Sequence, residues 1–168
     1  LSLFRQGVES GAAAVAVTGG GAMAQQAQAG LIPLVPVNAP GEPRSAVGYN
    51  LMLVLGILNC LNLVSTTDQD VAAATAGLSR RVSALEPRVP TNDNPAKQLA
   101  LELQDMLPII YGGGLFSGVA RRWKTQFNEN AKIWAFFEFI PELLHNSVES
   151  YGTSPSLGEQ LSAVILRP

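Results

Sequence analysis

The sequence has little cysteine, histidine or charge. Its 168 residues include one cysteine, one histidine and 14 % charged residues. The single Cys60 excludes an internal disulfide and a cysteine-rich metal site, and the single His145 leaves no pair of histidines to bind a metal. The formal net charge of −2 gives no electrostatic reason to expect nucleic acid or an anionic membrane as a partner.

The sequence also lacks an apolar run of bilayer length. Its strongest run, Leu51 to Val64, is interrupted by a glycine and two asparagines. It is shorter than the roughly 20 residues that span a membrane, so we expect a core helix. No basic segment precedes a hydrophobic stretch near Leu1, as a secretory signal requires. We expect Cys60, within the apolar run, to be a buried reduced thiol in a cytoplasmic protein.

What is present is a globular composition with 47 % hydrophobic residues, which is too apolar for a disordered chain. The length suits one good core or two small, incomplete ones. Both ends interrupt an expected element. Leu3 to Val8 has a helical pattern without a cap, and a strand pattern over Val164 to Leu166 stops at Arg167-Pro168. We therefore expect a partial chain.

Strand and helix signals alternate along the first half of the sequence. An apolar run ending in three glycines predicts a buried strand over Ala12 to Thr18. Ala22 to Ala29, rich in Ala and Gln, favours a helix. Two prolines in the apolar run Leu31 to Val37 indicate a strand end or an edge strand. A long apolar helix is expected from Ser45 to Val64. This order predicts a parallel sheet covered by helices.

The second half repeats this style after a linker. Thr66-Thr67-Asp68 predicts the start of an exposed helix that runs to Leu85. Prolines mark residues 86–94 as the linker, and Asn94 is expected to cap a helix that has Pro95 at its first position. The further expected elements are the helix Pro95 to Met106, the strand Leu107 to Tyr111, the helix Ser117 to Asn130, the strand Ile133 to Phe139, the short helix Pro141 to Val148 and the strand Ala163 to Leu166. The expected subdomains are residues 1–85 and 95–168.

A glycine turn follows the expected strand that ends at Tyr111. Glycines such as Gly113 and Gly114 let the backbone approach a ligand, and the N-terminus of the next helix, near Ser117, offers free N–H groups to a phosphate. The turn lacks the glycine spacing of a dinucleotide site and the Lys-Ser/Thr of a P-loop, which disfavours a nucleotide-binding domain. A tight packing turn explains the glycines equally well.

Three polar features offer chemistry. Helical spacing places Lys124 near Asn128 on one helix face, and Glu129, flanked by two asparagines, is suited to act as a base. A histidine such as His145 suits acid–base work. Arg44 follows a strand and a loop, at the edge where α/β sheets bind ligands, and an arginine there can stabilise an enediolate. A solvated helix end, a capping or core histidine and a surface arginine are the alternatives.

These segments together resemble the bifunctional phosphoglucose/phosphomannose isomerases of the SIS (sugar isomerase) superfamily. Family members show a similar Arg-Trp-Lys-x-x-x-Asn-Glu-Asn-x-Lys at residues 122–132, Pro-Glu-x-x-His-Asn at 141–146 and Pro-Arg-x-x-x-Gly at 43–48. The resemblance covers nearly the whole chain and is sharpest from Leu107 to His145. It implies an α/β fold with SIS-type, flavodoxin-like parallel sheets flanked by helices, in two truncated subdomains.

The resemblance implies an aldose–ketose isomerase that interconverts fructose 6-phosphate with glucose 6-phosphate or mannose 6-phosphate through a cis-enediol, without a metal or redox cofactor. Glu129 would move the proton between C1 and C2, in a sugar-sized cleft beside Arg44, which would stabilise the charged intermediate. His145 would assist ring opening in the neighbouring subunit of a homodimer. The substrate would be bound by Gly113, Gly114, Ser117, Lys124 and Asn128.

Two family features are missing from this sequence. They are a Ser-Tyr-Ser-Gly-Asn-Thr-like phosphate loop, expected before Leu1, and a helix with a substrate-binding lysine, expected after Pro168. The activity is therefore expected of the parent protein, and this chain by itself should bind sugar phosphate poorly. The alternative is a catalytically silent SIS module that binds sugar phosphates as a regulator. Such a module needs a phosphate pocket but neither Glu129 nor His145.

Overall fold

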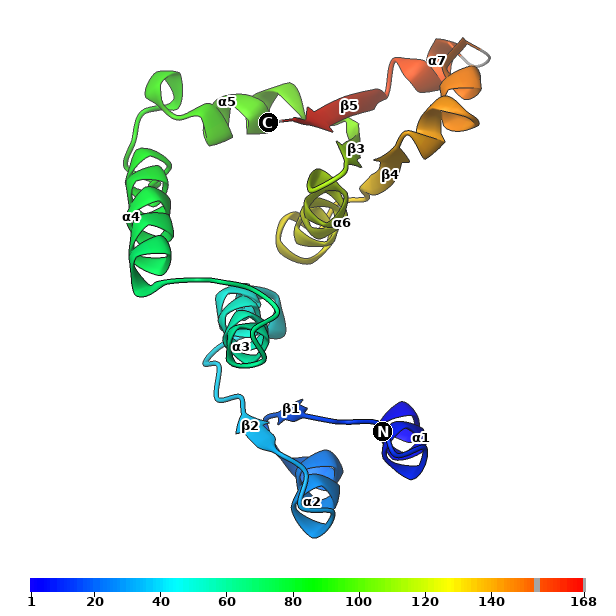
Figure 1. The fold of residues 1–168 in the computed structure, drawn as a ribbon. Coiled ribbons are helices and arrows are strands. Elements are labelled where there is room, and N and C mark those ends of the chain that lie inside the picture. Colours follow the sequence, from blue (N-terminus) through cyan, green and yellow to red (C-terminus); the bar gives the residue numbers. More distant parts are fainter. Residues whose placement is uncertain (153–154, 168) are drawn as a thin grey trace. The chain divides into compact units, whose positions relative to one another are not determined.

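The computed structural model of the chain describes residues 1–152 and 155–167 (Figure 1). The chain forms two compact units, Leu1–Val71 and Ala72–Pro168, called the N-terminal unit and the C-terminal unit below. Pro168, where the last strand was expected to stop, lies outside the described residues. In the described ranges, every helix is too short or too polar to cross a bilayer.

The N-terminal unit contains a small strand–helix–strand motif. Its first elements are α1 (Ser2–Glu9), β1 (Ala16–Thr18), α2 (Gly21–Ala29) and β2 (Leu34–Pro36). β1 and β2 pair in parallel, with Ala16 opposite Leu34. Ala16 and Ala27 are buried, and their small side chains let α2 lie close to the strands. The predicted alternation is confirmed, and a proline ends β2 as expected.

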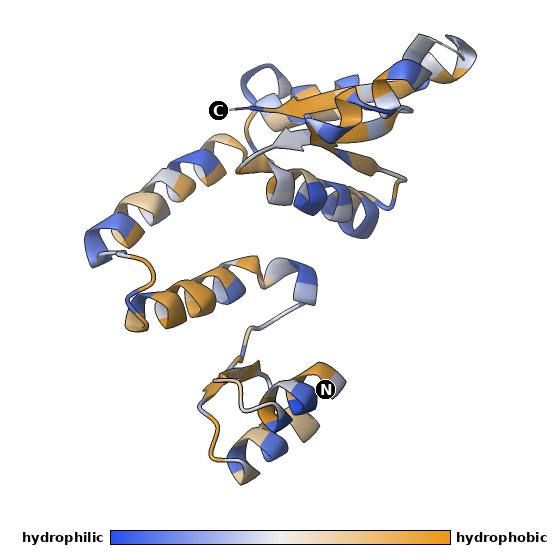
Figure 2. Ribbon diagram, turned by 45° about the vertical axis from the view of Figure 1, so that its right-hand side comes forward, coloured by the Kyte–Doolittle hydropathy of each residue, from blue (hydrophilic) through white to orange (hydrophobic). Residues whose placement is uncertain are grey.

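Helix α3 (Val47–Cys60) follows the short 3-10 turn η1 (Pro43–Ser45) and is hydrophobic over most of its surface (Figure 2). The predictions of a core helix and of a buried thiol are both wrong, because no residue of α3 is buried and Cys60 is exposed. Within the N-terminal unit α3 chiefly contacts the adjacent η1. No second layer of that unit therefore covers the cysteine.

Helix α4 (Asp68–Ala84) begins at a reciprocal pair of hydrogen bonds. The backbone N–H and the hydroxyl of Thr67 donate to Oδ2 of Asp70 at 2.9 and 2.7 Å, and the N–H of Asp70 donates to Oγ1 of Thr67 at 3.2 Å. This arrangement is a capping box, with Asp70 in the position usually held by Glu or Gln. The predicted helix start is confirmed, although Asp70 rather than Asp68 makes the contact.

Asn94 joins the linker to helix α5 (Pro95–Glu102). Its Oδ1 accepts hydrogen bonds from the backbone N–H groups of Ala96 and Lys97 at 3.1 and 3.2 Å, and its Nδ2 donates to the carbonyl of Glu86 at 3.2 Å. Asn94 is fully buried. The predicted cap is confirmed, and the same side chain also anchors the linker, whose short turn η2 spans Thr91–Asp93.

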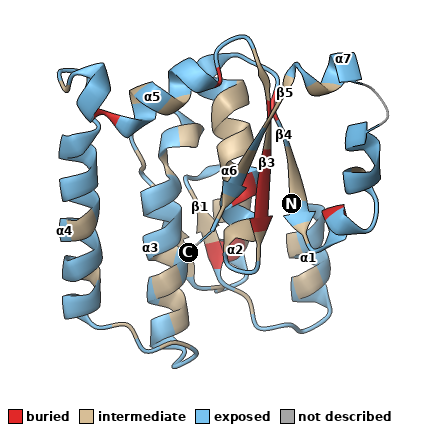
Figure 3. Cartoon of the chain, turned by 90° about the horizontal axis from the view of Figure 1, so that it is seen from above, coloured by how far each residue is buried: buried red, intermediate tan, exposed pale blue. Residues whose placement is uncertain are grey.

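The C-terminal unit is built on a three-stranded parallel sheet. Its strands are β3 (Leu107–Gly113), β4 (Phe136–Ile140) and β5 (Leu161–Leu166), in the order β4-β3-β5. The central β3 carries the longest run of buried residues in this unit (Figure 3). The chain leaves β3 toward β4 and then crosses back to β5, which is a flavodoxin-like order. The predicted α/β class with parallel strands is confirmed.

Helix α6 (Phe116–Gln126) covers one face of this sheet. The buried core consists of Ile110, Ala120 and Ala135. Partly buried hydrophobic side chains surround it: Trp123, Phe127, Phe137, Val164 and Leu166. The absence of a side chain at Gly112 permits the close approach, because a Cβ there would lie 2.3 Å from the carbonyl oxygen of Phe116.

The crossover from β4 to β5 contains only short helical pieces in its described part, which are η4 (Glu142–Leu144), η5 (Ser147–Gly152) and α7 (Pro155–Gly158). The single helix predicted over Pro141 to Val148 is wrong. Oδ1 of Asn146 accepts the N–H of Ser147 at 2.5 Å, which removes a donor that a continuous helix needs. Successive side chains of a strand point to opposite faces of the sheet. The strand residues that contact this crossover alternate with those that pack in the core, so the crossover lies on the sheet face opposite α6.

Candidate functional site

Glu129 lies in a π-helical turn at the end of α6. The turn, η3, spans Phe127–Ala131. Lys132 then adopts the left-handed conformation (φ 61°, ψ 29°), and the backbone N–H of Ile133 donates to the carbonyl of Phe127 at 3.4 Å. Such a wide turn leaves the α-helical path and is frequent at functional sites. The helix predicted from Ser117 to Asn130 is therefore correct in extent but not in the geometry of its last turn.

Two side chains hold this turn. Nζ of Lys132 donates to the backbone carbonyl of Glu129 at 2.5 Å, and Nδ2 of Asn128 donates to the carbonyl of Ile133 at 2.8 Å. Carbonyl groups at the end of a helix have no partner within the helix. Lys132 thus supplies a partner for a carbonyl group of this helix end, and Asn128 ties the turn to the chain that follows it.

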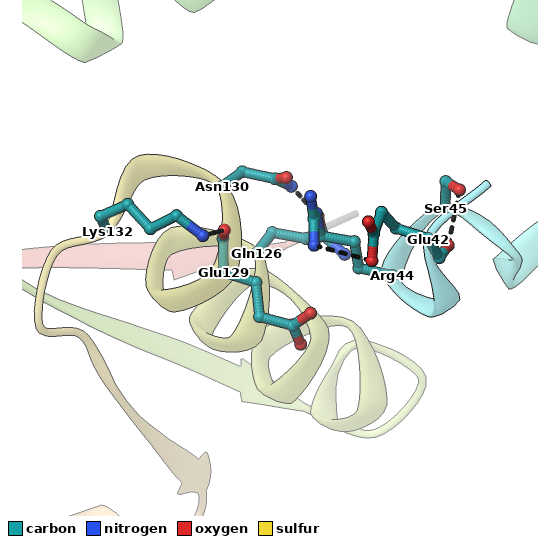
Figure 4. A network of polar contacts seen from close by, with 7 residues as sticks. All are labelled: Glu42, Arg44, Ser45, Gln126, Glu129, Asn130 and Lys132. Atoms are coloured by element: carbon teal, nitrogen blue, oxygen red, sulfur yellow. Dashed lines mark hydrogen bonds and ion pairs between the residues drawn. The ribbon is translucent and has the colours of Figure 1, made fainter.

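The carboxylate of Glu129 is exposed and points away from the side chains of Gln126 and Asn130 (Figure 4). Among the described residues it takes part in no hydrogen bond or ion pair. A shallow pocket of about 310 Å³ lies at this helix end and is lined by Trp123, Gln126, Phe127, Asn130 and Ala131. Glu129 is not among the lining residues. Since Arg44 belongs to the N-terminal unit, a cleft shared by Glu129 and Arg44 stays a prediction.

The predicted substrate-binding residues fall into two groups. Gly113, Gly114 and Ser117 lie at the start of α6, where Gly114 has φ +54° and the Ser117 hydroxyl reaches the carbonyl of Gly112 at 3.4 Å. Lys124 lies in the last turn of α6, and Asn128 lies in η3 with Glu129. The 11 residues of α6 span about 16 Å at the rise of an α-helix. Lys124 and Asn128 are thus at the same end of the helix as Glu129, whereas the glycine turn is at the opposite end.

His145 follows the turn η4 and is exposed. Its backbone N–H donates to the carbonyl of Glu142 at 2.9 Å, while the neighbouring Asn146 donates from Nδ2 to Oε1 of Glu142 at 3.0 Å. The imidazole itself makes no hydrogen bond or ion pair with the described residues. Its ring is therefore free to reach a group outside its own unit.

Arg44 lies in the 3-10 turn that precedes α3. Its Nη1 forms an ion pair with Oε2 of Glu42 at 3.5 Å (Figure 4). Ser45 fixes the same turn, because its hydroxyl donates to the carbonyl of Glu42 at 2.7 Å. The side chain of Arg44 is 32 % exposed. Within the described residues, no group of three or more His, Cys, Asp or Glu side chains is arranged to hold a metal ion.

Residues 92–168 match the family described as bacterial phospho-glucose isomerase C-terminal SIS domain. A bifunctional phosphoglucose/phosphomannose isomerase of Caldicellulosiruptor bescii is 34 % identical over 149 residues, which are 88 % of this chain and 44 % of that protein. Another, of Thermoplasma acidophilum, is 35 % identical over 148 residues, which are 87 % of this chain and 42 % of that protein. The chain belongs to the bifunctional phosphoglucose/phosphomannose isomerase family.

A solved structure supports the same family fold. A glucose-6-phosphate isomerase like protein from Thermus thermophilus superposes with a TM-score of 0.55 at 26 % sequence identity, over 82 % of this chain and 49 % of that chain. The chain spans less than half the length of these isomerase relatives. In the family motif Asn-Glu-Asn-x-Lys, the final Lys132 was not predicted as a site residue, and its fixed place in that motif is the sequence signal that points to it.

Proposed function

We propose that the protein is an aldose–ketose isomerase that interconverts fructose 6-phosphate with glucose 6-phosphate or mannose 6-phosphate. Membership of the isomerase family supports this activity. The observation that carries the proposal is the carboxylate of Glu129, which is exposed and unpaired within the described chain while its backbone is fixed by two side-chain hydrogen bonds. A base must be placed accurately and must also be free to accept a proton.

The proposed reaction moves a hydrogen between C1 and C2 through a cis-enediol. Glu129 takes the proton from one carbon and returns it to the other. Negative charge then develops on the sugar oxygens, and the guanidinium of Arg44 stabilises it. Lys124 and Asn128 hold the sugar beside Glu129. The proposal includes no metal or redox cofactor, because proton transfer next to a carbonyl is acid–base chemistry.

The glycine turn is proposed as a second contact point. Gly113 and Gly114 expose backbone at the carboxyl edge of the sheet, which is the edge where ligands bind in open α/β sheets. Ser117 adds a hydroxyl in the first turn of α6. Because α6 separates this edge from Glu129, the role of the turn needs its own test. Loss of substrate affinity in Gly114→Val without a change in kcat is the expected result.

The proposed assembly is a homodimer in the cytoplasm, where the reaction serves carbohydrate metabolism such as glycolysis and gluconeogenesis. The exposed imidazole of His145 supports a role in the active site of the neighbouring subunit, where it assists ring opening. Exposed aromatic residues on and before β4, Trp134 and Phe136, favour a buried interface. Light scattering of the complete protein at high concentration should give the mass of a dimer, and a monomer would contradict this part of the proposal.

The activity is tested with the complete protein and fructose 6-phosphate, following both glucose 6-phosphate and mannose 6-phosphate by NMR. We expect turnover, and we expect Glu129→Gln to lower kcat by at least about 10²-fold while calorimetry still detects sugar-phosphate binding. Glu159→Gln, a change of an exposed carboxylate outside the site, is the control. Binding without turnover in the unchanged protein would instead identify a silent sugar-phosphate-binding module.

A further inference from the structure

The last turn before β4 carries two polar side chains that bind backbone. Asn128 and Lys132 lie on either side of Glu129 in the sequence. The amide of Asn128 donates forward to the carbonyl of Ile133, and the ammonium of Lys132 donates back to the carbonyl of Glu129 itself. The two hydrogen bonds thus cross the turn in opposite directions, and Glu129 lies between them.

Helix geometry alone does not hold this turn. Beyond Gln126 the α-helical pattern gives way to the π-helical turn. The backbone hydrogen bond that closes this turn, from the N–H of Ile133 to the carbonyl of Phe127, is long at 3.4 Å. Since this backbone bond is long, the shorter side-chain bonds of Asn128 and Lys132 contribute to holding the backbone that carries Glu129.

We propose that Asn128 and Lys132 are positioning residues for the carboxylate of Glu129. The inference rests on the proposed isomerase function and adds the parts of the chain that orient its base. A reacting group displaced by about 1 Å can lose on the order of 10² in rate. Side chains that fix the backbone of the turn at residue 129 therefore act on catalysis through the position of the base, whether or not they also contact the sugar.

The side chains of Asn128 and Lys132 differ in the hydrogen-bonding groups that they still offer to a ligand. Nζ of Lys132 is bound to the Glu129 carbonyl at 2.5 Å, and this bond uses one of the three N–H groups of the ammonium. Asn128 uses only its Nδ2 for Ile133, and among the described residues its Oδ1 accepts no hydrogen bond. That oxygen can still accept a hydrogen bond from a sugar hydroxyl. A positioning role therefore predicts a loss of kcat for Lys132 variants and a mixed loss of kcat and affinity for Asn128 variants.

The test compares Lys132→Met, Lys132→Arg and Arg121→Met in the complete protein, with fructose 6-phosphate as substrate. Lys132→Met should lower kcat at least tenfold and leave KM within twofold, because the base is displaced but the sugar contacts remain. Lys132→Arg keeps a donor for the carbonyl and should recover kcat to within threefold of the unchanged protein. Arg121→Met removes an exposed cation from the same helix and should change neither constant.

Full kcat in Lys132→Met overturns the proposal, as does a loss confined to KM, which would make Lys132 a substrate contact. Thermal denaturation of each variant checks that it folds. If Lys132→Met does not fold, Asn128→Asp provides the second test, because it replaces the amide donor by an acceptor of the same shape. Absence of turnover in the unchanged protein would refute the isomerase function itself, so the two failures are distinguishable.

Discussion

The α-carbon of Gly112 faces the backbone of Phe116 so closely that a β-carbon would lie 2.3 Å from its carbonyl oxygen. The same β-carbon would lie 2.9 Å from Cβ of Ala120. Both partners are rigid parts of α6, so neither can move aside cheaply. This contact sets how near α6 lies to β3, and it ties the helix that leads to Glu129 to the centre of the sheet.

Gly112→Ala should destabilise the protein by about 1–3 kcal/mol or more, because it overpacks this contact. Gly118, in the helix α6 that Gly112 contacts, offers a control, since a Cβ there meets no atom within 4 Å. Gly118→Ala should stabilise by about 0.5–1 kcal/mol, because alanine reduces the freedom of the unfolded chain. Urea denaturation measures both, and equal effects in the same direction would contradict the close packing.

Asn94→Ala should cost about 1–3 kcal/mol of unfolding free energy. The substitution removes the cap of α5 and leaves the partly buried carbonyl of Glu86 without this donor. Asn92 is an exposed asparagine in the same linker, and Asn92→Ala should change stability by less than about 0.5 kcal/mol. Chemical denaturation followed by circular dichroism gives both values. A cost for Asn92→Ala as large as that for Asn94→Ala would argue against the cap.

The start of α4 should depend on pH. Hydrogen bonds from the hydroxyl and then the backbone N–H of Thr67 lower the pKa of Asp70 below its ordinary value. A carboxyl group with a lowered pKa in the folded state contributes stability above its unfolded pKa, and this contribution is lost as the pH falls through the folded pKa. The difference in melting temperature between the unchanged protein and Asp70→Asn should therefore be present at neutral pH and vanish in acid.

The control for this prediction is Thr67→Val, which removes the hydroxyl but keeps the backbone donor. In that background the effect of Asp70→Asn should shrink, because the largest cause of the shift is gone. If the difference in melting temperature between the unchanged protein and Asp70→Asn persists unchanged at low pH, the carboxylate does not act through its charge.

Ile110 and Ile165 compare the centre and the edge of one sheet. Ile110 on β3 is fully buried, whereas Ile165 on β5 is 60 % exposed. Ile110→Ala should cost about 2–5 kcal/mol, since it opens a cavity against Ala120 and Ala135. Ile165→Ala should lower the free energy of unfolding clearly less, because the side chain of Ile165 already contacts water. Similar costs at the two positions, measured by calorimetry, would place the core elsewhere.

Local signals in the sequence were sufficient for the presence and order of the strands, the start of α4 and the cap at Asn94, because each depends on neighbouring residues. The exposure of Cys60 was not predictable in this way. It depends on whether other chain segments cover α3, and an apolar helix has the same sequence pattern whether it is covered or not. The short crossover turns likewise depend on one side chain, that of Asn146, competing for a backbone donor.

The candidate site was predictable in its residues but not in its shape. The shared motifs point to Glu129, yet a pattern of polar residues at helical spacing cannot distinguish an α turn from a π turn. That difference brings Lys132 to the carbonyl of Glu129 and Asn128 to Ile133. With the π turn, β4 also begins later in the sequence than predicted, at Phe136 rather than at Ile133. The distance between the glycine turn and Glu129 follows from the direction of α6.

The central position of β3 has a consequence for biosynthesis. Both of its partners, β4 and β5, come later in the chain. During synthesis a growing chain therefore exposes the strand that becomes most buried in this unit with an open edge until β5 has left the ribosome. Such edges attract other chains. The nascent protein is consequently prone to aggregation until β5 joins the sheet. Slow translation of the crossover before β5 should therefore lower the yield of folded protein.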